Sequence, residues 1–248
     1  MSARQVSILM YHSISDGPGP TCTRPEVFKQ QMAAVADSGG RGVTLREFVA
    51  WHRGEKELAA GAVVLTFDDG YADFATLAYP ELKSRGWSAT VFLPAGKVGG
   101  TDDWEGGSRS LMDWPTVAAL AREGIEFGAH GVTHANLTAL SPTAACQEIA
   151  AAKRMIEDKV GGPVTTFAAP FGKTTPTLQA VIRDEYRAAA GTMLAQASRR
   201  SNLYDLPRIE MWYYRDAGRW RAYLEGRGQA YYLGRKALRA LRFIALPG

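Results

Sequence analysis

Short apolar runs rich in β-branched residues alternate along this chain with longer amphipathic segments. The runs predict strands at Val6–His12, Ala62–Phe67, Ala89–Leu93, Ile125–His130, Val164–Ala168, Arg187–Ala190 and Asp205–Ile209. This alternation is typical of an α/β protein with a mostly parallel sheet covered by helices. Seven strands can close into a barrel, but the pattern alone fits an open doubly wound sheet equally well.

Two of the intervening segments carry clear helix signals. Thr44 and Glu47 form a capping-box pattern ahead of an apolar stripe. Ser141 precedes Pro142, which is the arrangement of an N-cap and a first helical position, and this helix is expected to run to Gly161. The polar, glycine-rich stretch 99–110 predicts a mobile surface loop instead.

Chemically capable residues gather where the predicted strands end. They are His12, the pair Asp68 and Asp69, the pair His130 and His134, the segment Pro170-Phe171-Gly172, and Arg208 in the last strand. The carboxyl ends of parallel strands form the active-site edge of α/β proteins. The sequence therefore predicts that these residues meet in one site.

The His130 and His134 pair has the spacing H-x-x-x-H. Two imidazoles and one carboxylate make a good ligand set for a catalytic divalent metal, because they leave positions open for water and substrate. Zinc is the first expectation, and another first-row metal is the alternative. Paired histidines near a turn are also common as capping or surface residues. Gly128 and Gly131, which flank the pair, favour the metal site.

Asp68 and Asp69 are adjacent carboxylates at the end of an apolar strand. Such a pair is costly to bury, and a bound cation relieves that cost for one member while leaving the other available as a general base. Gly70 permits a sharp turn after the pair. The alternative interpretation is a turn that ends the strand and caps the next helix.

Three motifs, TFDDG, HGVTH and AAPFG, resemble in this order those of the polysaccharide deacetylases, a family with a chitooligosaccharide-deacetylase homology domain. ILMYHSIS and LPRIE are similar to the branch that contains poly-N-acetylglucosamine deacetylases. The resemblance spans residues 6–211. It implies a distorted (β/α) barrel with about seven parallel strands, and hydrolysis of N-acetyl groups from an amino-sugar polymer or oligosaccharide.

The resemblance also implies residue roles. Asp68 is the expected general base, Asp69, His130 and His134 the ligands of a divalent metal such as Zn²⁺, and the Phe171 N–H an oxyanion donor. Two departures need substitutes. Ala168 and Ala169 stand where many relatives have an arginine, so Arg208 is expected to orient Asp68. No histidine follows His134, so His12 is expected to be the general acid, with a structural strand-end histidine as the alternative.

Aromatic and motif residues near the site are the expected substrate contacts. Trp104 is the better candidate for stacking on a sugar, and Tyr71 and Pro170 are the other predicted contacts. Trp114 precedes a proline at a helix start and is expected to serve in packing.

Composition supports a soluble protein. Of its 248 residues, 46% are hydrophobic and 22% are charged, and no apolar run approaches 18 residues. The first residues do not form a signal-peptide core, so a cytoplasmic location is expected, although a removed export signal would leave no trace. Cys22 and Cys146 are isolated and are expected to be reduced.

Charge divides the chain into a predicted catalytic domain, residues 1–214, and a basic amphipathic tail, residues 215–248. The tail carries eight basic and two acidic residues, against 21 and 23 in the remainder. Apolar residues recur at helical spacing in it, which suits either contact with a membrane surface or packing on the barrel. No nucleic-acid motif is present, so no such partner is expected.

Two other functions remain open at this level. One is deacylation of a lipid-linked or nucleotide-linked amino sugar, and the other is non-catalytic carbohydrate binding.

Overall fold

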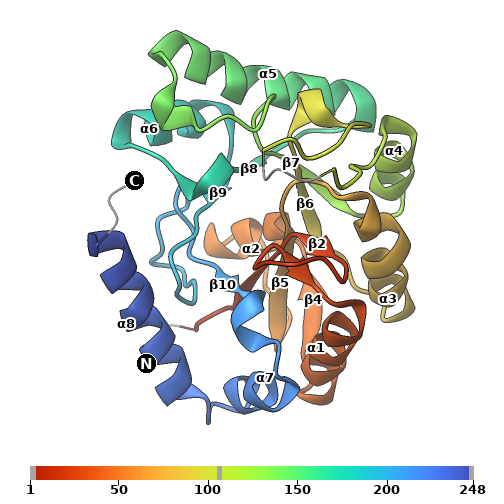
Figure 1. Ribbon diagram of the computed structural model, residues 1–248, viewed down its shortest axis with the longest axis vertical. Helices are drawn as coiled ribbons and strands as arrows, with labels where there is room; N and C mark the ends of the chain where they lie inside the picture. Colours follow the sequence, from red (N-terminus) through yellow and green to blue (C-terminus); the bar gives the residue numbers. More distant parts are fainter. Residues whose placement is uncertain (1–3, 105–107, 246–248) are drawn as a thin grey trace.

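A curled sheet of parallel strands forms the centre of the molecule in a computed structural model that describes residues 4–104 and 108–245, with side chains to residue 238 (Figure 1). The strand order is β10-β1-β5-β6-β7-β8-β9, and β4 pairs with β5 beside this path. The seven strands of the path are β1 (Ile8–Tyr11), β5 (Ala62–Phe67), β6 (Thr90–Leu93), β7 (Glu126–Ala129), β8 (Thr166–Ala168), β9 (Ala188–Ala190) and β10 (Ile209–Glu210). The predicted α/β class and the count of seven strands are confirmed.

The sheet closes on itself just before β10. Leu206 forms a parallel bridge with Ala190. Its N–H donates to Ala189 O at 2.9 Å, and its carbonyl accepts from Gly191 N at 2.8 Å. These bonds join the two ends of the strand path, which makes the architecture the distorted (β/α) barrel that the motifs imply.

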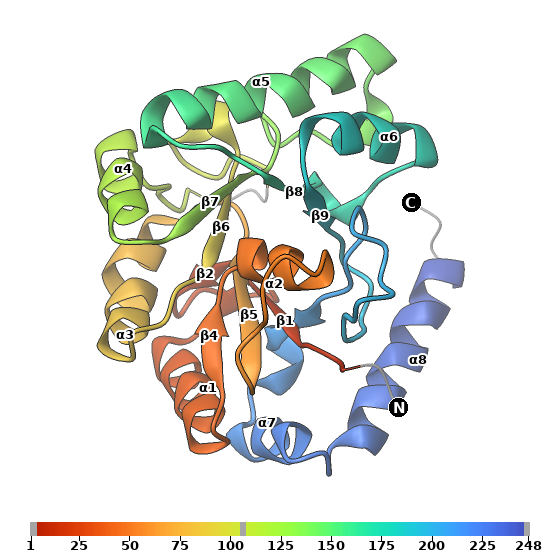
Figure 2. The same ribbon diagram turned by 180° about the vertical axis from the view of Figure 1, so that it is seen from behind.

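Helices surround the barrel, as the front and back views show (Figures 1 and 2). They are α1 (Pro25–Asp37), α2 (Leu45–His52), α3 (Tyr79–Ser84), α4 (Trp114–Arg122), α5 (Pro142–Val160), α6 (Pro176–Glu185), α7 (Ala217–Leu224) and α8 (Gln229–Ala245). The capping box of Thr44 and Glu47 is present on α2. Ser141 caps α5, which ends at left-handed Gly161, so both helix predictions are confirmed.

Helix α2 closes the amino-terminal end of the barrel. Leu45 N donates to Thr90 Oγ1, and Arg46 N donates to the carboxylate of Glu126. Thr90 and Glu126 are the first residues of their strands. Phe48 and Trp51 of this helix pack with inward-facing strand residues in one buried cluster. The opposite, carboxyl-terminal end is left for the site.

Three local features were not expected. β4 (Arg41–Val43) was missed, because three residues containing Gly42 give no apolar run. The pair β2 (Ser13–Ile14) and β3 (Cys22–Thr23) was also missed, because two-residue strands give no apolar run. The expectation of a mobile surface loop at 99–110 is wrong for Asp102, which is fully buried and hydrogen-bonded. Residues 105–107 of that loop lie outside the described residues. Trp114 begins α4 and packs against the core, as predicted.

The tail folds into α7 and α8. Trp220 is fully buried, and its indole N–H donates to Gln31 O of α1 at 3.1 Å. Tyr223 and Tyr232 are buried in the same core cluster. Within the described residues, none of the helices is long and apolar enough to cross a bilayer.

Candidate active site

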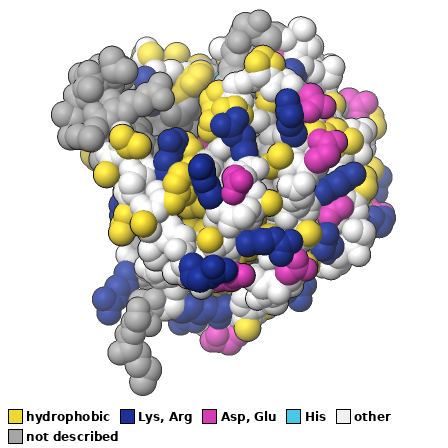
Figure 3. Space-filling view, turned by 60° about the horizontal axis from the view of Figure 1, so that its bottom comes forward, with side chains coloured by type: hydrophobic (Ala, Val, Ile, Leu, Met, Phe, Trp, Pro, Cys, Tyr) yellow, Lys and Arg dark blue, Asp and Glu magenta, His cyan; other side chains and the backbone are white. Residues whose placement is uncertain are grey.

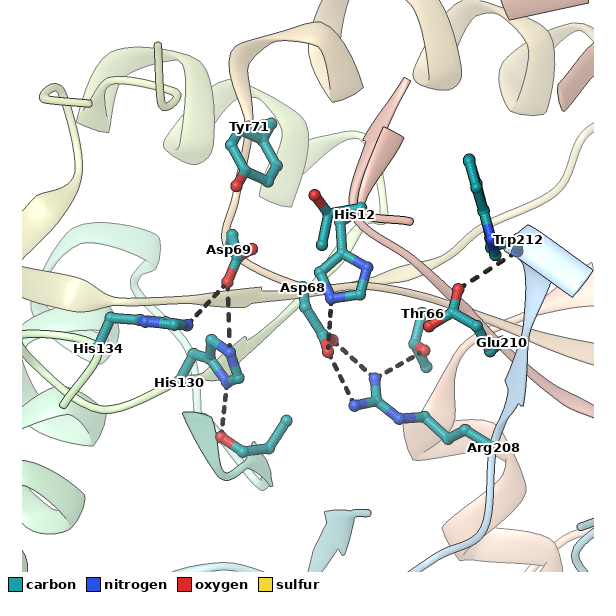
Figure 4. A network of polar contacts seen from close by, with 12 residues as sticks. His12, Thr66, Asp68, Asp69, Tyr71, His130, His134, Arg208, Glu210 and Trp212 are labelled. Atoms are coloured by element: carbon teal, nitrogen blue, oxygen red, sulfur yellow. Dashed lines mark hydrogen bonds and ion pairs between the residues drawn. The ribbon is translucent and has the colours of Figure 1, made fainter. Parts of the chain in front are cut away.

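Strand register brings His12 and Asp68 to the same place. Tyr11 of β1 is paired with Phe67 of β5, and Asp68 N donates to Tyr11 O at 2.9 Å. Side chains alternate along a strand, so Asp68 faces the same side as Val64 and Thr66, which is the barrel interior. His12 follows Ile8 and Met10 by the same rule. Figure 4 shows both side chains in the polar network at this edge.

Arg208 fixes the orientation of the Asp68 carboxylate. Its Nη1 lies 2.7 Å from Asp68 Oδ1 and its Nη2 lies 2.8 Å from Oδ2, a two-point contact. Gly191 O and Thr66 Oγ1 accept further bonds from the same guanidinium. Burial raises the pKa of Asp68, but Arg208, with smaller contributions from His130 and His12, outweighs it and leaves the pKa below its ordinary value. Asp68 is therefore ionised.

Asp69, His130 and His134 form a second, separate cluster. Asp69 Oδ1 lies 3.4 Å from His130 Nε2 and 3.2 Å from His134 Nε2. One ligand atom from each residue lies within 4.8 Å of the others, and all three side chains are buried. Asp69 Oδ1 nevertheless makes no hydrogen bond within the described residues. Three donor atoms that converge without bonding one another are the arrangement that a divalent cation requires.

The backbone fixes which nitrogen of His130 faces the cluster. His130 Nδ1 lies 2.7 Å from Ala168 O, at the end of the neighbouring strand β8. A carbonyl oxygen only accepts, so Nδ1 carries the hydrogen and the lone pair of Nε2 points toward Asp69. This is the orientation that a metal-binding imidazole needs.

The protonation states of Asp69, His130 and His134 depend strongly on one another. Burial raises the pKa of Asp69, but His130 and His134 outweigh it, and the pKa falls far below its usual range. Burial lowers the pKa of His130, whereas Asp69 and Asp68 together raise it above the ordinary value. For His134 burial dominates, and the pKa is lowered.

Three site residues adopt left-handed backbone conformations. They are Asp69, His134 and Phe171, with φ values of 73°, 61° and 59°, and they are the non-glycine residues with positive φ among the described part of the chain. Such conformations are unfavourable for L-residues and cluster at functional sites. Gly70, Gly131 and Gly172 also have positive φ, which allows these turns to be tight.

His12 stands at the open side of Asp68. Its Nε2 lies 3.9 Å from Asp68 Oδ2, and its side chain keeps 17% of its surface exposed. Its Nδ1 is buried and has no hydrogen-bond partner in the described residues. His12 thus lies between Asp68 and solvent.

Aromatic rings enclose His134. The indole of Trp104 stacks on its imidazole with ring centroids 4.0 Å apart and an interplanar angle of 22°. Phe171 meets it edge-on at 4.8 Å and remains half exposed. Gly172 N and Lys173 N donate to Ala169 O and Pro170 O inside this turn. Pro170 lacks an N–H, so Phe171 supplies the turn's remaining amide donor.

Tyr71 belongs to a network that the sequence did not predict. Its hydroxyl donates to Asp102 Oδ2 at 3.0 Å and accepts from Arg109 Nη2 at 2.6 Å. The Arg109 guanidinium also stacks on the Tyr71 ring at 4.3 Å. Burial raises the pKa of Tyr71 far above its ordinary value. This network anchors the segment that carries Trp104. Tyr71 and Pro170 are both buried, and substrate contact by either remains a prediction.

The carboxylate–histidine cluster lies at the carboxyl ends of parallel barrel strands, which is where enzymes of this architecture have their active sites. Comparisons with known proteins identify the family. The family model for polysaccharide deacetylases matches residues 55–189. The chain belongs to the polysaccharide deacetylase family.

Individual relatives differ in how much of the chain they cover. YxkH of Bacillus subtilis (strain 168), whose name describes a polysaccharide deacetylase, is 29% identical over 208 residues, which are 84% of this chain and 71% of YxkH. The poly-beta-1,6-N-acetyl-D-glucosamine N-deacetylase of Escherichia coli (strain K12) is 34% identical over 91 residues, 36% of this chain and 13% of that protein.

Solved structures show the same fold. The Streptococcus pyogenes deacetylase PplD, in complex with acetate, has a TM-score of 0.74 and 26% identity, covering 84% of this chain and 92% of PplD. IcaB from Ammonifex degensii has a TM-score of 0.73 and 24% identity, covering 88% of this chain and 97% of IcaB.

Proposed function

We propose that this protein is a metal-dependent hydrolase that removes N-acetyl groups from an amino-sugar polymer or oligosaccharide. The observation that carries the proposal is the convergence of Asp69, His130 and His134 beside a separate, ionised carboxylate, Asp68. A binding protein has no need for two buried acidic groups in different environments, whereas a hydrolase needs one for the cation and one for proton transfer.

The residues fit a divalent cation held by Asp69 Oδ1, His130 Nε2 and His134 Nε2. Two imidazoles and a carboxylate favour Zn²⁺, although other first-row metals accept the same set. Such an ion, when bound, supplies Lewis acidity that polarises an amide carbonyl.

Asp68 is the proposed general base. Its two oxygens are fixed by Arg208, so the carboxylate keeps one orientation and stays ionised at neutral pH. It accepts a proton from the attacking water. The same ion pair weakens Asp68 as a base, so efficient proton transfer depends on placement more than on pKa.

His12 and Phe171 complete the proposed reaction. His12, which lies on the solvent side of Asp68, donates a proton to the leaving amine, because an amine anion is a very poor leaving group. The Phe171 N–H donates to the oxygen of the acetyl group as negative charge develops there.

Names of the relatives support the substrate class. The Escherichia coli relative acts, by its name, on poly-beta-1,6-N-acetyl-D-glucosamine. Trp104 offers an aromatic wall over His134, next to the place where the acetyl group would react. We therefore propose an N-acetylated saccharide as substrate, with Trp104, Tyr71 and Pro170 shaping its binding site.

Acetate release tests the function directly. Purified protein is loaded with Zn²⁺ and incubated with β-1,6- and β-1,4-linked N-acetylglucosamine oligosaccharides, and acetate is measured. We expect release by the loaded protein, loss after chelation and recovery when Zn²⁺ is returned. Metal content of His134→Ala is measured in parallel, and close to one ion per wild-type chain and much less in the variant is expected. Saccharide binding without acetate release from any substrate would instead identify a non-catalytic carbohydrate-binding protein.

A further inference from the structure

A basic groove of about 840 Å³ is lined by two segments that closely follow proposed site residues in the sequence, one after His12 and one after Arg208. It runs between the β2–β3 segment, the 3₁₀ turn Met211–Tyr214 and helices α7 and α8. Four of its lining residues are arginines, namely Arg24, Arg215, Arg219 and Arg235. The groove lining also includes two carboxylates, Asp16 and Asp216, so its net charge is positive.

Both walls of the groove continue directly from strands that carry the site. β2 begins at Ser13, the residue after His12. The turn Met211–Tyr214 follows β10 directly and begins three residues after Arg208. Figure 4 shows Trp212, a groove residue, on the side of His12 that faces away from His134. The groove is therefore built on segments that leave the same edge of the barrel as His12.

Three of the arginines are held against aromatic rings. Arg215 lies over Trp212 at 3.5 Å, Arg219 over Tyr231 at 5.0 Å and Arg235 over Tyr213 at 4.0 Å, each measured to the ring centroid. A stacked guanidinium keeps its planar edge, and the N–H groups on it, available for an oxyanion. Stacking also reduces the side-chain entropy that binding would otherwise remove.

The nearby carboxylates already have other partners. Asp216 caps α7 by accepting from Arg219 N at 2.8 Å. Asp16 pairs with Arg24 at 3.6 Å, and both of these side chains are exposed. Arg235 Nε is buried and has no hydrogen-bond partner within the described residues. Arg24 is thus paired with a carboxylate, whereas Arg215, Arg219 and Arg235 stack on aromatic rings and form no ion pair within the described residues.

The surrounding surface is more mixed in charge than the groove. Figure 3 turns the lower end of the molecule toward the viewer and shows Lys and Arg side chains interspersed with acidic and apolar ones. A groove with stacked arginines suits a phosphoryl group, because several planar donors can share its oxygens. A neutral saccharide would leave these donors without an acceptor.

Building on the proposed deacetylase function, we infer that the groove binds a phosphoryl group carried by the substrate, so that the preferred substrate is an N-acetylated saccharide that carries a diphosphate. Arg215, Arg219 and Arg235 are the specificity-determining residues in this assignment. The sugar lies at His12 and the phosphoryl group lies over the arginines. The carrier beyond the phosphates, nucleoside or prenyl, is distinguished by experiment.

Direct binding tests the groove without turnover. Inorganic pyrophosphate is titrated into metal-free protein by calorimetry, so that no metal can bind it. We expect saturable binding that weakens as salt rises, because the contact is electrostatic. Arg219→Gln combined with Arg235→Gln should weaken binding by roughly 10-fold or more, since charge-assisted hydrogen bonds are lost. Arg215→Gln, at an exposed position, tests the same surface if the double variant fails to fold.

A matched control separates this effect from loss of net charge. Arg122 of α4 and Arg154 of α5 are exposed and lie outside the groove lining. Arg122→Gln combined with Arg154→Gln removes two charges, as the groove double variant does, and should leave pyrophosphate binding unchanged. Equal binding by wild type and the groove variants, or no binding by wild type, would overturn the inference.

Kinetics connect the groove to the substrate. UDP-N-acetylglucosamine and a short prenyl-diphosphate-linked N-acetylglucosamine are compared with a neutral N-acetylglucosamine oligosaccharide. We expect kcat/KM for at least one diphosphate to fall about 10-fold in the groove variants, with no change for the neutral substrate. If the variants slow every substrate equally, the groove is structural and the inference fails. If pyrophosphate binds but no substrate releases acetate, the proposed function fails while the anion site stands.

Discussion

Arg208 and Asp68 are 140 residues apart in sequence, yet their side chains form a buried two-point ion pair with N–O distances of 2.7 and 2.8 Å. β1 lies between β10 and β5 in the sheet, and this order brings the two residues together across it. Removing one partner of such a pair leaves a buried charge without compensation.

Replacing Arg208 is expected to change the pH dependence of activity. In Arg208→Gln, burial of Asp68 is no longer opposed by the guanidinium, so the Asp68 pKa rises. The acidic limb of the kcat/KM profile should move to higher pH, because Asp68 must be ionised to act. Arg208→Lys should move the limb less, since it keeps the charge. An unshifted limb in both variants would contradict the assignment of Asp68 as base.

The Asp68–Arg208 pair should also make the free energy of unfolding depend on pH. The lowered pKa of Asp68 contributes stability that is present above the unfolded value, about 3.9, and is lost as pH falls through the folded value. Arg208→Gln should therefore reduce the free energy of unfolding by about 3–5 kcal/mol at neutral pH and by less in acid. Chemical denaturation at both pH values measures this.

The metal content of two variants should distinguish the roles of Asp68 and Asp69. Asp69→Asn removes a ligand charge and should weaken metal binding, whereas Asp68→Asn should keep the metal and lose activity. Elemental analysis of dialysed protein, alongside acetate release, distinguishes the two. Equal metal loss in both variants would mean that both carboxylates are ligands.

His12→Ala should retain the metal and lose at least about 100-fold in kcat, the usual scale for general acid–base catalysis. Its side chain contacts no atom of the proposed ligand set, so metal content is a clean control. A variant with close to wild-type kcat would leave His12 with only a structural role.

Trp104 should restrain His134. Trp104→Phe keeps an aromatic face and should bind metal as the wild type does. Trp104→Ala removes the stack on His134 and should lower the affinity for the metal by up to the 10- to 100-fold that is typical of residues supporting a metal ligand. Competition with a fluorescent chelator measures the affinity. Indistinguishable affinities would restrict Trp104 to substrate contact, which KM reports.

Helix α8 is the part of the tail for which contact with a membrane surface remains a prediction. Trp220 and Tyr223 of α7 are buried, so a chain ending near Tyr214 would expose the core. A chain ending at Gly228 is the better comparison. The intact protein should co-sediment with phosphatidylglycerol vesicles at low salt, and the shortened one should not. Equal behaviour of the two would identify α8 as a structural cap.

Sequence patterns predicted the elements that are long or strongly marked. The six-residue strand Ala62–Phe67 was predicted to the residue, because an apolar run ends sharply at two aspartates. The Ser141 cap and the Gly161 stop gave the bounds of α5 for a similar local reason. β4 was missed because Gly42 interrupts its apolar pattern. The glycine is required by packing, since a Cβ at this position would lie 2.6 Å from the Leu65 side chain. The place of β4 in the sheet depends on tertiary contact.

The site residues that the sequence predicted were likewise those with a clear local signal. Residues at strand ends were found, since parallel strands bring their carboxyl ends together. Asp102 and Arg109 were not found, because their link to Tyr71 is made across 31 and 38 residues by a polar, glycine-rich loop that was expected to lie on the surface. No local pattern distinguishes a buried aspartate in such a loop from an exposed one. The catalytic roles of the site residues remain predictions for the experiments above.

The left-handed backbone at Asp69, His134 and Phe171 has a consequence for evolution and engineering of this fold. Each such residue costs roughly 1–2 kcal/mol, which glycine would avoid. Selection for stability alone would therefore favour glycine at all three positions, yet the chain places an acid, an imidazole and an aromatic ring there. A library selected for thermal tolerance alone should accumulate glycine at these positions. Glycine at Asp69 and His134 would remove two proposed metal ligands, whereas glycine at Phe171 would keep the proposed N–H donor.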